Sequence, residues 1–307
     1  MRLPRPLTGI VPPMVTPLTG PDDLDAAGLE RLLQHLEQGG VSALFILGTT
    51  GEGPGLSYRL RREVIDRVCD YAGDRLPVLV GVADTSLVES LLLADYAARK
   101  GAAAVVTTCP YYFPMSQGEY LSFLERVSPD YALPLFLYNL PRHVGFSIGA
   151  KTARCAADLP NVWGLKDSSG DLDYFREVAG LLRERPEFSL LNGPEQILAE
   201  TVAMGAHGGV CGGANLYPKL YVGLYNAARD RNEPEIKRLH KQVLEICDLV
   251  YTHGPDGSSY LRGIKCALEL AGICAGAMAE PYSALTGEPR EKIGRALAAM
   301  GLLATSV

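Results

Sequence analysis

The chain has 307 residues, of which 47% are hydrophobic and 21% charged, a balance typical of a globular protein with a sizeable core. Its net charge of -6 argues against nucleic acid and anionic membranes as partners, because either would select a basic face. The seven cysteines contain no C-x-x-C pair, which favours reduced thiols in a cytoplasmic protein over a disulfide framework.

Short apolar runs rich in β-branched residues alternate with longer amphipathic stretches over the first 230 residues. The expected strands are Gly9–Val15, Ala43–Leu47, Pro77–Val82, Ala103–Thr107, Pro134–Tyr138, Val162–Lys166, Ser189–Asn192 and Gly209–Gly212. The helices expected between them include Asp25–Gln38, Ser57–Tyr71, Leu87–Lys100 and Leu172–Arg183. Ser86 and Asp171 stand where N-caps of two of these helices belong, and Gly101 is expected to end one of them.

This alternation predicts a parallel sheet with helical crossovers, and eight units favour a closed (β/α)8 TIM barrel over residues 1–230. The alternative is a doubly wound sheet, but no G-x-G-x-x-G motif follows the first strand. After residue 230 the pattern changes to helices without strands, at Pro234–Tyr251, Tyr260–Ala271 and Glu288–Ala299. Residues 231–307 are therefore expected to form a C-terminal helical appendage.

Lys166 carries the strongest chemical signal, because active sites of such barrels lie at the carboxyl ends of the strands. It ends an apolar strand, so its side chain is expected in the barrel mouth. Burial disfavours an ammonium ion and makes a neutral amine available as a nucleophile. The alternatives are a lysine that reaches solvent or one that pairs with Asp167. Tyr138, which ends the preceding strand, favours Schiff-base chemistry because that chemistry needs an acid–base group beside the amine.

Thr49 and Thr50 lie in a glycine-bounded turn after the second expected strand. Glycines let backbone N–H groups approach a ligand, and together with the two hydroxyls they can hold a carboxylate. No Gly-Lys-Ser/Thr follows, so the turn is not a phosphate loop. The five histidines are scattered along the chain, which predicts no metal site.

Several motifs together resemble the dihydrodipicolinate synthase / N-acetylneuraminate lyase family of class I aldolases. They are Val15–Pro17, Gly48–Glu52, Pro110–Tyr112, Leu137–Pro141, Gly164–Asp167 and Gly263–Ala267, in the family's order. The resemblance implies that Lys166 forms the Schiff base and Tyr138 relays protons. It implies that Thr49 and Thr50 bind the pyruvate carboxylate, with Thr50 also in the proton relay.

The same resemblance implies an assembly. Tyr112 matches the relay tyrosine that reaches the neighbouring subunit's site, and Val210 matches the residue whose backbone carbonyl faces the substrate. Family members are usually homotetramers, built as dimers of dimers, and need no metal or organic cofactor.

Departures from the family pattern bear on the substrate. The arginine that gathers the second substrate's carboxylate in dihydrodipicolinate synthases is replaced, by spacing, by His143, with Arg142 one residue early. The segment that contains Ser168 looks more like members that act on 2-keto-3-deoxy sugar acids or 4-hydroxy-2-oxo acids. Gly193 and Glu195 stand in a region that partly resembles the hydroxyl-binding region of sialic-acid lyases.

The sequence thus predicts a Schiff-base lyase or aldolase that condenses pyruvate, or a related 2-oxo acid, with an aldehyde, or releases one. Three alternatives stay open: a genuine 4-hydroxy-tetrahydrodipicolinate synthase, a dehydratase that uses the same imine, and a non-catalytic 2-oxo-acid-binding protein. The first two keep Lys166 and Tyr138 in their roles, whereas a binding protein needs neither of them.

Overall fold

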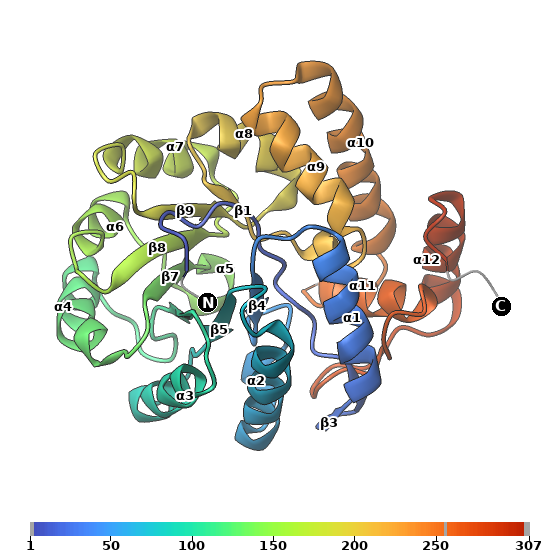
Figure 1. The fold of residues 1–307 in the computed structure, drawn as a ribbon, viewed down its shortest axis with the longest axis horizontal. Coiled ribbons are helices and arrows are strands. Elements are labelled where there is room, and N and C mark those ends of the chain that lie inside the picture. Colours follow the sequence, from blue (N-terminus) through green and yellow to red (C-terminus); the bar gives the residue numbers. More distant parts are fainter. Residues whose placement is uncertain (1–2, 255–256, 304–307) are drawn as a thin grey trace.

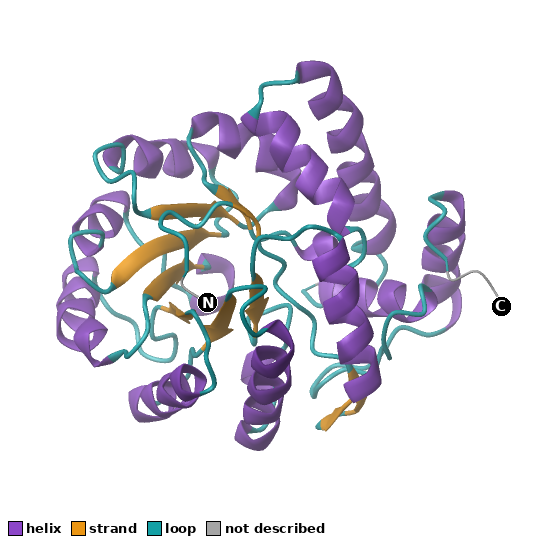
Figure 2. Cartoon of the chain, in the orientation of Figure 1, coloured by secondary structure: helices purple, strands orange, loops and turns teal. Residues whose placement is uncertain are grey.

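A computed structural model describes residues 3–254 and 257–303 and shows a closed barrel of eight parallel strands (Figures 1 and 2). The strands are β1 (Gly9–Ile10), β4 (Leu44–Ile46), β5 (Val78–Gly81), β6 (Ala104–Thr108), β7 (Leu135–Asn139), β8 (Val162–Asp167), β9 (Ser189–Asn192) and β10 (Gly208–Gly209). The sheet runs β1-β10-β9-β8-β7-β6-β5-β4. A bridge from Pro13 to Phe45, with Met14 N donating to Phe45 O at 2.8 Å, closes it. The predicted (β/α)8 fold is confirmed.

Each strand is buried on both faces, which explains its apolar composition. One set of side chains, including Phe45, Leu79, Val106 and Phe136, packs inside the barrel. The residues that alternate with them pack against the surrounding helices, as Leu44, Ile46, Val78 and Val80 do. The period of two along each strand separates the two cores and fixes which residues face the mouth.

Nine helices occur in the described part of the chain up to residue 230, most of them on the outside of the barrel (Figure 2). They are α1 (Ala26–Gln38), α2 (Tyr58–Ala72), α3 (Leu87–Arg99), α4 (Gln117–Val127), α5 (Pro141–Val144), α6 (Ala150–Ala156), α7 (Leu172–Leu181), α8 (Leu198–Met204) and α9 (Pro218–Arg229). The predicted N-caps are confirmed, since Ser86 accepts from Glu89 N and Asp171 accepts from Tyr174 N. Gly101 follows α3 with φ +86, as a C-terminal stop requires.

One small element was not expected. The strands β2 (Leu18–Gly20) and β3 (Asp23–Leu24) form an antiparallel hairpin after β1. Such short strands leave no period-two pattern to recognise in a sequence.

Three further helices follow the barrel: α10 (Glu233–Val250), α11 (Ser259–Leu270) and α12 (Gly287–Ala299). They lie together on one side, near α1 and α9, in orange to red in Figure 1. Their existence and type are confirmed, whereas a boundary at residue 230 stays a prediction. Over the described residues, no helix is long and apolar enough to cross a membrane.

Candidate active site

The turn between β4 and α2 is held in an unusual backbone conformation. Leu47 and Glu52 have φ values of 58° and 56°, in a region that side chains other than glycine rarely adopt. A Cβ on Gly53 would lie 2.1 Å from the carbonyl oxygen of Leu47, so only glycine allows this fold of the chain. Strain of this kind persists where the surrounding structure enforces it and is common at active sites.

Anchors on several sides keep this turn in place. Thr16 donates its hydroxyl to Gly51 O at 2.7 Å. The carboxylate of Glu52 accepts from Lys265 Nζ of α11 at 2.6 Å and from Ala279 N at 2.9 Å. The Glu52 and Lys265 side chains are only 3% and 1% exposed, so this ion pair is almost fully buried. Removing either partner would leave an unpaired charge in the interior, which is strongly destabilising. The ion pair therefore holds the turn firmly against α11.

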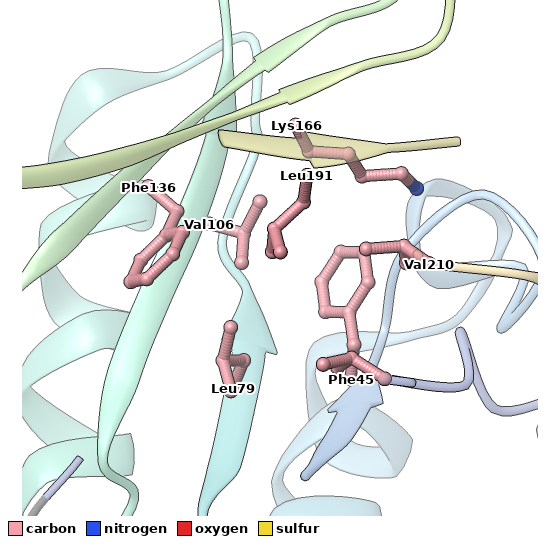
Figure 3. Close-up of a pocket in the computed structure, with 8 residues that line it drawn as sticks. Phe45, Leu79, Val106, Phe136, Lys166, Leu191 and Val210 are labelled. Carbon is pink, nitrogen blue, oxygen red and sulfur yellow. The ribbon is translucent and has the colours of Figure 1, made fainter. Parts of the chain in front are cut away.

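Lys166 lies where the sequence predicts, in β8 and inside the barrel mouth. Its amine is 3.9 Å from the ring centroid of Tyr138 and 5.1 Å from that of Phe45. Below the amine, apolar side chains line a small internal cavity, and Figure 3 shows the Lys166 chain extending over them toward Val210. The Lys166 side chain is 6% exposed, so bulk water is largely kept from the amine.

The alternative that Lys166 pairs with Asp167 is excluded by the contacts of Asp167. That carboxylate accepts from Asn139 Nδ2 at 2.7 Å and from Ser169 Oγ at 2.9 Å. Burial raises the pKa of Asp167, although these hydrogen bonds oppose the rise. Asp167 therefore holds neighbouring strand ends together and leaves the amine of Lys166 to the mouth.

Tyr138 stands at the centre of the site, where the charge of Lys166 and the side chains of Thr49 and Ser168 act on its phenol. Burial alone would raise the pKa of Tyr138, but the charge of Lys166 and these two side chains outweigh burial and lower it. An acidified phenol next to an amine is suited to passing protons in both directions.

The two threonines divide their contacts between different parts of the site. The side chain of Thr49 contributes to the lowered pKa of the Tyr138 phenol. The hydroxyl of Thr50 instead lies 3.0 Å from the hydroxyl of Tyr260, a residue of α11 that sequence reasoning did not single out. Neighbouring residues in a tight turn point in different directions, so the two hydroxyls have different neighbours, and the relay role predicted for Thr50 stays a prediction.

Ser168 and Gly193 are brought together beside Tyr138. A Cβ on Gly193 would lie 2.0 Å from Ser168 Oγ. Gly193 therefore makes room for the serine whose side chain acts on Tyr138. Val210 lines the same cavity as Lys166. Its backbone N–H donates to the carbonyl oxygen of Asn192 at 2.7 Å.

Arg142 and His143 are exposed residues of α5, which follows β7. Although His143 is exposed, partial desolvation of its ring lowers the pKa of His143, and the charges of Arg142 and Lys166 lower it further. The charge of Lys166 therefore acts on His143 as well.

Two further predicted site residues are Tyr112 and Glu195. Tyr112 is 75% exposed and packs edge-to-face against Phe113, so its predicted role in a neighbouring subunit's site stays a prediction. Glu195 is buried, and both of its carboxylate oxygens are occupied within the chain: Oε2 accepts from Gly213 N at 2.9 Å, and Oε1 accepts from Tyr251 at 2.8 Å. The prediction that Glu195 binds substrate gives way to a structural role, because its acceptors are taken. In the described residues no group of three His, Cys, Asp or Glu side chains is arranged as metal ligands.

The lowered pKa of Tyr138 gives a pH-dependent signal. In the wild-type protein one tyrosine should ionise below the ordinary pKa of 10.0, because the positive charge of Lys166 favours the phenolate. In Lys166→Met the charge is gone while burial remains, so the same tyrosine should ionise above 10.0. Ultraviolet difference titration of tyrosinate absorbance measures this ionisation in the wild-type protein and in Lys166→Met. Tyr138→Phe is the control and should remove the early component; an early component that persists in Tyr138→Phe would show that another tyrosine is responsible.

Comparison with known proteins places this site in a family. The model of the dihydrodipicolinate synthetase family matches residues 6–300. A dihydrodipicolinate synthase structure from Bacteroides thetaiotaomicron is 50% identical, covers 97% of this chain and all of its own, and superposes with a TM-score of 0.94. The 4-hydroxy-tetrahydrodipicolinate synthase of Salinibacter ruber is 34% identical over 77% of this chain and 78% of its own.

A third relative points to sugar-acid chemistry. YagE of Escherichia coli K12, whose structure is solved with pyruvate, is 28% identical over 96% of this chain and 99% of its own, with a TM-score of 0.90. Its name provisionally assigns it as a 2-dehydro-3-deoxy-D-gluconate aldolase. Relatives with both kinds of name therefore share this fold.

Proposed function

The chain belongs to the dihydrodipicolinate synthetase family of carbon–carbon lyases, and we propose that its Lys166 forms a Schiff base with pyruvate or a similar 2-oxo acid. The observation that carries the proposal is the Lys166 amine, 3.9 Å from the Tyr138 ring in a mouth that is largely closed to water. Thr49 and Thr50 supply hydroxyls next to it, on the turn anchored by Glu52. A nucleophile, a proton carrier and a carboxylate site thus converge.

The reaction follows from these positions. The phenolate of Tyr138, favoured by the charge of Lys166, takes a proton from the ammonium group, and the neutral amine then attacks the keto carbon while Thr49 and Thr50 hold the carboxylate. Tyr138 gives its proton to the carbinolamine hydroxyl, which leaves as water and produces a protonated imine. The phenolate of Tyr138 takes a proton from C3 to give an enamine, whose carbon adds to an aldehyde. The alkoxide that forms takes the proton back from Tyr138, and hydrolysis of the new imine returns the amine. In reverse, the same steps cleave a longer 2-oxo acid into pyruvate and an aldehyde.

For the aldehyde half we favour 2-keto-3-deoxy sugar acids or 4-hydroxy-2-oxo acids over aspartate semialdehyde. By spacing His143 takes the place of the synthase arginine, and an imidazole exchanges hydrogen bonds with hydroxyls, whereas an arginine is suited to a carboxylate. YagE and its name support this choice. The alternative, a 4-hydroxy-tetrahydrodipicolinate synthase, is supported by the Bacteroides and Salinibacter relatives and would use Arg142 to hold the second carboxylate. A dehydratase that uses the same imine would share every step as far as the enamine.

We propose that the enzyme works as a homotetramer in the cytoplasm, without a metal or organic cofactor. Tyr112 and Phe113 are about three-quarters exposed, which suits an aromatic pair that a neighbouring subunit covers. The cysteines are all free thiols, as a reducing compartment requires.

The test is to incubate the protein with pyruvate and borohydride and to measure its intact mass. We expect the mass of one reduced pyruvate to be added per chain, on the peptide that contains Lys166. Pairing each candidate aldehyde with pyruvate under the same conditions then identifies the second substrate. Binding of pyruvate without any trapped adduct would contradict the proposal and favour a 2-oxo-acid-binding protein.

A further inference from the structure

We propose that Tyr260, in the C-terminal helix α11, is a positioning residue that orients the Thr50 hydroxyl toward the carboxylate of the 2-oxo acid. The inference rests on the proposed function, since it assigns a role at the same site. Tyr260 is 210 residues from Thr50 in the sequence, yet the two hydroxyl oxygens are 3.0 Å apart.

The direction of this hydrogen bond follows from the chemistry of the two groups. The 3.0 Å separation allows either oxygen to donate, and we assign Tyr260 as the donor and Thr50 as the acceptor because a phenol is a stronger acid than an aliphatic hydroxyl. Burial raises the pKa of Tyr260, and the nearby carboxylate of Glu195 raises it further, so the phenol keeps its proton. With its oxygen accepting from Tyr260, Thr50 has its own proton free to donate to a bound carboxylate.

The Tyr260 ring is fixed by a buried network on the far side of the site. It packs edge-to-face against the ring of Tyr251, with the two ring centroids 4.8 Å apart. Tyr251 and Tyr221 both donate to Glu195 Oε1 at 2.8 Å. Glu195, which sequence reasoning placed against the substrate, thus supports the tyrosine that positions Thr50.

Two further features show that the phenol is held closely against the mouth. A Cβ on Gly212 would lie 1.7 Å from the Tyr260 hydroxyl, so the close approach requires glycine at this position. One and a half turns further along α11, Lys265 forms the buried ion pair with Glu52 at the end of the same turn that carries Thr50. Helix α11 therefore contacts the turn between β4 and α2 twice, through the hydroxyl of Tyr260 and through the charge of Lys265.

The expected effect of Tyr260→Phe is on affinity rather than on chemistry. Loss of one hydrogen bond should raise the pyruvate concentration that half-saturates borohydride trapping by about three- to tenfold. The trapping rate at saturating pyruvate should change less than about twofold, because Lys166 and Tyr138 keep their contacts, and a uniform loss of binding leaves the later step unchanged.

A double-mutant cycle separates positioning from packing. In Thr50→Val, which keeps the shape but removes the hydroxyl, adding Tyr260→Phe should raise the half-saturating concentration no further. Tyr131→Phe is the matched control, because this buried tyrosine bonds to Ser90 at 3.1 Å, away from the mouth, and should behave as wild type. Thermal unfolding checks that each variant is folded.

The proposal is overturned if Tyr260→Phe keeps the wild-type half-saturation, if its effect persists in full without the Thr50 hydroxyl, or if only the saturating rate falls. Failure of the proposed function looks different, because wild-type protein would then yield no Lys166 adduct. In that case calorimetric affinities for pyruvate, measured on the same four proteins of the cycle, apply the same test to Tyr260.

Discussion

Lys166→Met should abolish the pyruvate adduct and lower turnover by a factor on the order of 10⁶, the loss measured when the nucleophile of a covalent enzyme is removed. Methionine has nearly the length of lysine and suits the apolar surroundings of Phe45 and Val210, so the barrel should keep its shape. What disappears is the amine, without which no protonated imine can form to stabilise the carbanion at C3. Trapping with borohydride and a pyruvate-release assay measure the two losses.

The same substitution should not destabilise the protein. No ion pair joins Lys166 to a carboxylate among the described residues, and the rings of Phe45 and Tyr138 lie near its amine. Replacing a buried amine by an apolar side chain commonly leaves the free energy of unfolding unchanged or raises it by about 0.5–2 kcal/mol, the usual pattern when a functional group is removed. Thermal unfolding should therefore occur at or above the wild-type temperature.

Lys151→Met provides the control, because Lys151 is exposed on α6 and the variant makes the same chemical change outside the mouth. It should keep the adduct and the turnover of the wild type. An adduct that persists in Lys166→Met, or turnover above a hundredth of the wild type, would place the reactive amine elsewhere.

The parts of the structure that the sequence predicts are those determined by local patterns. The strand that ends at Lys166 was expected over Val162–Lys166 and is observed over Val162–Asp167, because residues inside a barrel alternate with residues under the helices. Lys166 and Tyr138 were placed together for a similar reason: parallel strands end at one rim, and these two residues are paired in register across β7 and β8.

The parts that were missed depend on contacts between distant segments. Nothing near Tyr260 in the sequence signals that its hydroxyl meets Thr50, and the buried pair of Glu52 and Lys265 joins residues 213 positions apart. The motif Gly263–Ala267 did mark the right helix, although the role of its lysine could not be read from a pattern. The different neighbours of Thr49 and Thr50 depend on turn geometry that a sequence does not specify.

Tyr138→Phe should slow formation of the pyruvate adduct by about 10²- to 10⁴-fold, the usual contribution of a general acid or base. Phenylalanine keeps the ring that the Lys166 amine faces at 3.9 Å and removes only the hydroxyl on which Lys166, Thr49 and Ser168 act. The carbinolamine must then lose its hydroxyl without a positioned proton donor. Half-saturation with pyruvate should change little, because the carboxylate rests on the threonine turn. Rapid-quench trapping at saturating pyruvate measures the rate.

Tyr120→Phe is the matched control, because Tyr120 is a fully buried tyrosine whose hydroxyl has no hydrogen-bond partner among the described residues. Its adduct should form at the wild-type rate. If Tyr138→Phe also formed the adduct within about fivefold of the wild-type rate, the proton would have to come from another group, and Ser168 would be the next candidate because its side chain acts on the phenol. A large loss of adduct-formation rate in Tyr138→Phe, with unchanged half-saturation, would instead assign proton transfer to Tyr138 and carboxylate binding to Thr49 and Thr50. The first function would then depend on the end of β7 and the second on the turn that follows β4.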